Sequence, residues 1–182
     1  MLKVYIPPTE YYDERSNLFT TVDGITLSLE HSLVSISKWE SKWKKEFLSK
    51  DPLTVEQTTD YIRCMTITPN VNPLVYRAIP PSVIKQVNDY IADDMSATTF
   101  YDTKENKPQP KKQKRITSEY LYYVMFSLGI PKECEKWHLN RLLALIKIYQ
   151  VENNKTKMSK KDLYSQNRSL NAARRAALHS KG

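Results

Sequence analysis

The histidines and cysteines are the side chains that most often build metal or nucleophilic sites, and their spacing argues against both kinds of site. His31, His138 and His179 lie in unrelated segments, and neither Cys64 nor Cys134 has a second cysteine at CxxC spacing. Zinc sites and redox-active thiol sites need such ligands close together. We therefore expect two free, buried thiols and no metal site.

The glycines also argue against a nucleotide site. The chain has only three, and Gly24, Gly129 and Gly182 fall at a turn, a helix end and the terminus. Phosphate-binding loops place several glycines at fixed spacing so that the backbone can approach the ligand. No GxSxG elbow occurs, and Glu30-His31 is an isolated acid–histidine pair. The sequence predicts no cofactor and no enzyme activity.

Tryptophan and arginine side chains are the main candidates for binding a partner. Trp39 and Trp43 are four residues apart on one face of a predicted helix, and Trp137 lies in a second aromatic and charged segment, 136–143, which also contains Arg141. Two interpretations stay open, because tryptophans at helical spacing belong in a core as readily as in a groove that anchors a partner helix. Three further arginines lie in the basic C-terminal segment: Arg168, Arg174 and Arg175.

The positive charge is concentrated in two segments. The 182 residues carry a net charge of +8, of which 104–115 contribute +5 (six basic, one acidic) and 155–182 contribute +7 (eight basic, one acidic). The remainder is therefore mildly acidic, at −4. Basic segments of this kind keep a protein soluble, attract acidic partners or contact phosphates. No apolar run approaches the roughly 20 residues that cross a bilayer, and the N-terminus lacks a signal peptide, so no membrane contact is expected.

Short strands are predicted at the N-terminus. Leu2, Val4 and Ile6 alternate with polar residues before Pro7-Pro8. Two further alternating runs, 19–22 and 25–29, are separated by Asp23-Gly24, which favours a two-residue hairpin turn. We predict a small hairpin or sheet over residues 1–30.

Helical periodicity follows. Apolar residues from Leu33 to Phe47 predict one amphipathic helix, and Thr54 with Gln57 resembles a capping box that opens a second. A short turn is expected around 74–76, and Pro81 opens a helix that carries Val83, Ile84, Val87, Tyr90 and Ile91.

The C-terminal part is also predicted to be helical. Thr117 caps a helix that ends near Gly129, and a longer helix runs from about Lys132 to Glu152. The predicted fold is mainly α, a multi-helix protein with a small N-terminal β-hairpin or sheet. Its parts are a β element (1–30), a helical part (31–101), a basic linker or loop (102–116), a helical hairpin packed on the first helices (117–154), and a basic terminal helix or tail (155–182).

Five segments resemble the tail assembly chaperones of long-tailed phages that infect Gram-positive hosts. In chain order they read LEHSL, SKWESKW, DYIRCMT, WHLNRLL and LNAARR, and together they span most of the chain. The resemblance is weakest through the proline-bearing stretch and the basic linker.

The resemblance implies a protein that binds the phage tape measure protein and keeps it soluble while the tail tube assembles. It implies the host cytoplasm as location, absence from the mature virion, and several copies along one client. Further partners that it implies are a longer frameshifted form of the same protein and other tail proteins.

Two other functions remain open. One is a structural component of the tail or baseplate, which would stay in the virion. The other is a nucleic-acid-binding protein that uses residues 111–115 and the helix with Arg168, Arg174 and Arg175, although nucleic acid is not the expected partner.

Overall fold

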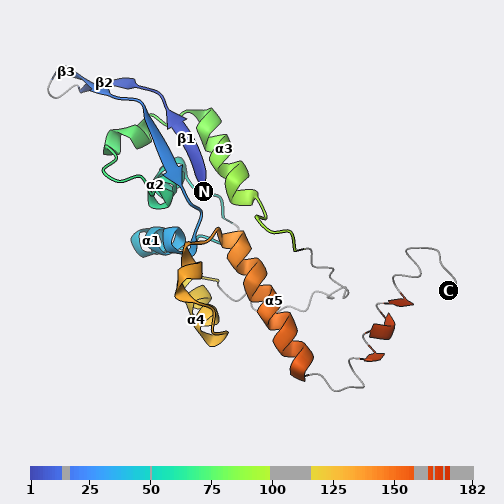
Figure 1. Ribbon diagram of the computed structural model, residues 1–182. Helices are drawn as coiled ribbons and strands as arrows, with labels where there is room; N and C mark the ends of the chain where they lie inside the picture. The colour runs from blue at the N-terminus through green and yellow to red at the C-terminus, as the bar shows by residue number, and fades with distance from the viewer. Residues whose placement is uncertain are drawn as a thin grey trace.

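The N-terminal strands form one long ribbon folded back on itself. In the computed structural model, which describes residues 1–13, 17–49, 51–98, 116–157, 164–165, 167–169 and 171–172, β1 (Leu2–Ile6) pairs antiparallel with β4 (Ile25–Leu29). β2 (Thr9–Asp13) pairs in the same way with β3 (Leu18–Val22). Both ladders share one register, since Ile6 lies opposite Ile25 and Thr9 opposite Val22. The two small sheets are therefore one hairpin with an interruption (Figure 1).

The hairpin turn predicted at Asp23-Gly24 is wrong. β3 and β4 do not pair with each other, and Gly24 does not adopt a positive φ. The shared register places Pro7-Pro8 opposite Asp23-Gly24, and prolines cannot donate the ladder hydrogen bonds. Glycine at position 24 instead leaves room for the Tyr5 side chain, because a Cβ at this position would come within 2.4 Å of the Tyr5 hydroxyl.

The next two helices follow the predicted caps. α1 (Leu33–Trp43) begins at Ser32, whose side chain accepts from the Ser35 N–H, and ends where Lys44 takes a left-handed conformation. It is thus shorter than the predicted helix, which extended to Phe47. α2 (Val55–Met65) opens with the predicted capping box between Thr54 and Gln57.

α2 and the next helix enclose the β1–β4 ribbon. The backbone of β4 bonds to the end of α2, through Glu30 N–H to Met65 C=O (2.9 Å) and Ile67 N–H to Ser28 C=O (2.8 Å). A 3-10 turn, η1 (Pro73–Arg77), leads to α3 (Pro81–Ala92), which packs along β1 (Figure 1). Pro81 stands in the first turn of α3, as predicted.

The helix predicted from Lys132 to Glu152 is divided, which corrects the sequence interpretation. After α4 (Ser118–Ser127), a 3-10 turn η2 (Lys132–Lys136) precedes α5 (Leu139–Lys157). The break lies at His138, which forms a β-bridge with Ser32, while Leu139 N–H bonds to His31 C=O at 2.7 Å. Residues 132–136 therefore form only a 3-10 turn, and α5 begins after this long-range backbone contact.

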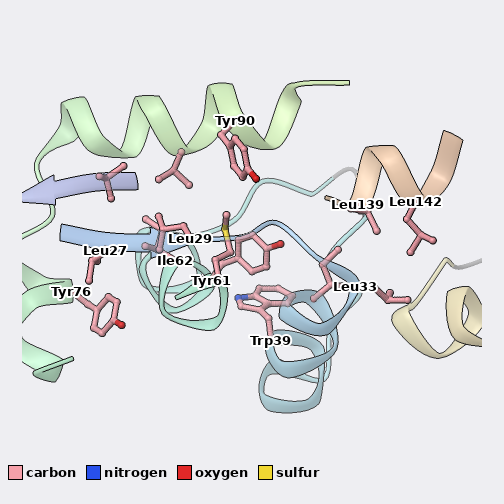
Figure 2. Packing of buried hydrophobic residues seen from close by; sticks show 14 of the residues in the cluster. Leu27, Leu29, Leu33, Trp39, Tyr61, Ile62, Tyr76, Tyr90, Leu139 and Leu142 are labelled. Carbon is pink, nitrogen blue, oxygen red and sulfur yellow. The ribbon is translucent and has the colours of Figure 1, made fainter. Parts of the chain in front are cut away.

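The core joins the N-terminal ribbon to helices from both halves of the chain. Buried apolar side chains come from β1, β4 and each of α1 to α5. Figure 2 shows Leu29, Tyr61 and Trp39 in the centre of the core, with Leu33 between them and Leu139 and Leu142 of α5. α1 packs against α2, α4 and η2. The predicted fold class, mainly α with a small N-terminal β element, is confirmed.

Two predicted parts fall largely beyond the described residues. The basic linker lies outside them except for Ile116. Of the expected terminal helix, residues 164–165, 167–169 and 171–172 are helical. Cys64 and Cys134 are free thiols as expected, although Cys64 is only partly buried.

Candidate partner-binding surfaces

Trp39 belongs to the core and cannot anchor a partner. Its side chain has no exposed surface, and its Nε1–H donates to the Gln57 carbonyl at 3.0 Å. The indole stacks on Trp43 with 6.1 Å between ring centroids and meets Phe47 edge-on at 5.2 Å. Both the polar and the apolar surface of Trp39 are therefore satisfied within the chain.

Trp43 lies half-buried beside a carboxylate. Its Nε1–H donates to Asp60 Oδ2 at 2.8 Å, and Lys42 Nζ reaches Asp60 Oδ1 at 2.5 Å. Burial of the Asp60 carboxyl opposes its ionisation, but the hydrogen bonds from Lys42 and Trp43 hold its pKa below the usual value. Arg63 adds a second ion pair to Asp60 at 3.1 Å. The Trp43 N–H and the Lys42 ammonium group thus tie α1 to Asp60 of α2.

Trp137 and Arg141 form a separate pair at the start of α5. The guanidinium carbon of Arg141 lies 4.4 Å from the centroid of the indole, a cation–π arrangement. Trp137 is half-buried, and Arg141 is exposed. This pair is accessible from solvent, unlike Trp39.

The remaining predicted arginines do not join these tryptophans. Arg168 is exposed and lines a shallow hollow of about 340 Å³ with Tyr164 and Asn171, beyond the end of α5 (Figure 1). Arg174 and Arg175 lie outside the described residues. The seven candidate residues therefore do not form one site in the described part of the chain.

The four resembling segments that the structure describes meet at one place in the core. Seven aromatic rings from α1, the residues just before and after α1, α2, α3 and the bridge at His138 contact one another in series, and we call them the aromatic chain. His31 and His138 are neighbours in it, with ring centroids 5.0 Å apart. Its members are Trp43, Trp39, Phe47, Tyr61, His31, His138 and Tyr90. LEHSL, SKWESKW, DYIRCMT and WHLNRLL therefore supply five of these seven rings, and Phe47 and Tyr90 supply the other two.

The aromatic face of α4 is the first accessible surface that sequence reasoning missed. Leu121 and Met125 are buried, while Tyr123 and Phe126 are 65% and 60% exposed. Burial and a hydrogen bond to the Glu135 carboxylate raise the pKa of Tyr122 to about 12. The sequence does carry this signal, because apolar or aromatic residues occupy every side of the run 120–128, and helical spacing puts its four aromatic residues on the side opposite Leu121 and Met125.

A groove between α2 and α3 is the second such surface. It encloses about 370 Å³ and is lined mainly by apolar side chains of both helices and the segment before α2. The lining comprises Phe47, Leu53, Val55, Thr58, Tyr61, Ile62, Ile84, Val87, Asn88 and Ile91. Sequence reasoning assigned Val55, Ile84 and Ile91 to helices but could not say that their helices would leave a gap.

The described residues contain neither a metal-binding cluster nor a membrane-spanning helix. That part of the chain contains no group of three or more His, Cys, Asp or Glu side chains that could hold a metal ion. None of its helices combines the length and the apolar character needed to cross a membrane.

No family model, curated protein or solved structure matches this chain. The resemblance to tail assembly chaperones rests on the quoted segments. Since four of those segments build the aromatic chain, they bear on the fold more directly than on an exposed binding site.

Proposed function

We propose that this protein is a phage tail assembly chaperone, a binding protein without catalytic activity of its own. It acts in the host cytoplasm, binds the tape measure protein, and keeps it soluble until tail-tube subunits enclose it. Such a client exposes repeated apolar helix faces before assembly, and such faces aggregate unless they are covered.

This proposal rests on the apolar surface that the fold leaves exposed, although the chain as a whole is strongly charged. The face of α4 with Tyr123 and Phe126 bears a single charged side chain, Glu119, although the whole protein has a net charge of +8. Tyrosine-rich surfaces with few charged side chains are typical of interface centres. The groove between α2 and α3 adds a second surface that is lined mainly by apolar side chains.

The test is co-expression with the tape measure protein of the same phage, followed by affinity purification and analysis of purified virions. A soluble complex, together with absence of this chain from virions, is the expected result. A tape measure protein that stays insoluble and unbound would overturn the proposal. Stoichiometric presence in virions would favour a structural tail or baseplate component instead.

A further inference from the structure

The outer half of the N-terminal ribbon has a free strand edge. Within the part of the chain that the structure describes, β3 pairs with β2 alone, and no other helix or strand packs extensively against it. Figure 1 shows β2 and β3 at the end of the ribbon, away from α1, α4 and α5. Phe19 is 70% exposed, and Thr20 and Thr21 are also exposed. The side of β3 that faces away from β2 is therefore accessible to a further strand.

The edge of β3 lacks the features with which proteins commonly block strand pairing, namely charged side chains, prolines and bulges. β3 contains no charged residue and no proline, and its ladder with β2 runs without a bulge. β2, in contrast, carries the exposed Glu10, which would repel a like-charged strand laid against it. Of the two edges of this ribbon, that of β3 is thus the one suited to strand addition.

The sequence of β3 is complementary to itself when two copies run antiparallel. If Thr20 lies opposite its own copy, Phe19 lies opposite Thr21, and Leu18 lies opposite Val22. Threonine pairs and pairs of an aromatic with a β-branched residue are among the cross-strand pairs that stabilise sheets. A second copy of this chain therefore supplies a strand that matches β3 at every position.

We propose that two copies of this protein pair through β3, antiparallel about a two-fold axis at Thr20, to form a four-stranded sheet in the order β2–β3–β3–β2. An isolated two-stranded hairpin is marginally stable, and further strands stabilise it. Asp23, the first charged residue after β3, then lies opposite Asn17 of the copy, so no like charges meet there. This inference goes beyond the proposed function and does not depend on it.

The association is expected to be weak. β3 is five residues long, and such a contact buries much less surface than the roughly 1,200–2,000 Å² of a stable interface. We expect a dissociation constant between about 10 μM and 1 mM, measured by analytical ultracentrifugation of the full chain across that range of concentrations. A chain that remains monomeric at about 1 mM would overturn the proposal.

Two cysteine variants test the position of the two-fold axis. Residues directly opposite each other in an antiparallel ladder have Cα atoms about 4.5–5.5 Å apart, within reach of a disulfide. Thr20→Cys should therefore form a disulfide-linked dimer under oxidised glutathione. Thr21→Cys changes the next exposed residue, but it lies diagonally from its own copy, at about 7–8 Å, and should crosslink at least about tenfold less. Both variants carry Cys64→Ser, because Cys64 is only partly buried.

Equal crosslinking of Thr20→Cys and Thr21→Cys would indicate random collision and overturn the proposed register, as would a failure of both to crosslink. Reduction should return the Thr20→Cys dimer to monomer on a denaturing gel.

Two lysine variants separate strand pairing from a change in overall charge. Thr20→Lys places two ammonium groups opposite each other across the axis, whereas Thr26→Lys adds the same charge at an exposed position of β4, opposite Tyr5 in the inner ladder. The first is expected to weaken self-association by about tenfold or more, and the second by much less. Equal weakening by both would mean that net charge governs association, against pairing through β3.

Discussion

The imidazole rings of His31 and His138 lie 5.0 Å apart inside the protein and join its two halves. His31 Nδ1 is 2.6 Å from the Tyr61 hydroxyl. His138 Nε2 donates to the Tyr90 carbonyl at 2.9 Å, while its Nδ1 accepts from the Asn140 N–H at 3.3 Å in the first turn of α5. The Asn140 N–H thus ties the His138 ring to the first turn of α5.

The first prediction is that acid loosens this junction. Burial, followed by the charge of His138, lowers the pKa of His31 from 6.5 to about 3. The folded state therefore favours neutral His31, so its contribution is complete above about pH 6.5 and is lost as the pH falls toward 3. We expect the free energy of unfolding to fall by up to roughly 1.4 kcal/mol per pH unit in that window, measured by urea denaturation at about pH 7, 6 and 5.

The variant His31→Gln supplies the control for this prediction. Glutamine keeps a polar partner for Tyr61 but does not titrate, so the pH slope between about 6.5 and 5 should become shallower. Carboxylates titrate mostly below this window and contribute little to it. An unchanged slope in His31→Gln would mean that another group is responsible.

The second prediction concerns Glu40, a buried carboxylate that connects α1 to α4. Its Oε1 accepts from the Phe47 N–H at 2.9 Å and its Oε2 from the Ser118 N–H at 2.7 Å. Glu40→Ala leaves both N–H groups without these acceptors, so we expect a loss of about 2–4 kcal/mol in the free energy of unfolding. Urea denaturation measures this loss, and hydrogen exchange should show α4 opening first.

Glu119→Ala is the matched control for Glu40→Ala. Glu119 lies next to Ser118 in the first turn of α4, but its side chain is exposed. Its removal should therefore lower the free energy of unfolding by less than about 1 kcal/mol. Similar losses in the two variants would show that the helix terminus, and not the link to α1, is what matters.

The third prediction concerns Gly24 and Tyr5 on the N-terminal ribbon. A Cβ on residue 24 would lie 2.4 Å from the Tyr5 hydroxyl oxygen and 3.1 Å from Pro8 Cδ. Gly24→Ala should therefore displace the Tyr5 ring and lower the free energy of unfolding by about 1 kcal/mol. In a Tyr5→Ala background the same change should cost much less, and a double-mutant cycle by thermal denaturation measures the difference. A cycle without coupling would mean that Gly24 is required by its backbone alone.

The elements that the sequence predicted well are those encoded locally. The Thr54–Gln57 capping box, Pro81 in the first turn of α3 and Gly129 with its φ of 68° each depend on neighbours within four residues. The predictions were wrong where contacts between residues far apart in the sequence determine the structure. His138 interrupts the predicted helix because it pairs with Ser32, more than 100 positions away along the chain.

The candidate site was less predictable for the same reason. Helical spacing placed Trp39 and Trp43 on one face of α1, but it could not reveal that α2 covers that face through Gln57 and Asp60. The exposed surfaces, α4 and the groove between α2 and α3, are those left over once the helices have packed, so they depend on the complete fold.

The fourth prediction separates the two faces of α4. Met125 is fully buried, so Met125→Ala should create a cavity and lower the free energy of unfolding by about 2–5 kcal/mol. Its neighbour Phe126 is 60% exposed and contacts the Tyr122 ring at 6.2 Å, so Phe126→Ala should lower it by less than about 1 kcal/mol. Urea denaturation of both variants measures the contrast. Equal losses would mean that the chain itself covers the outer face of α4, whereas the expected contrast leaves that face free for a partner, because its aromatic side chains then contribute little to folding.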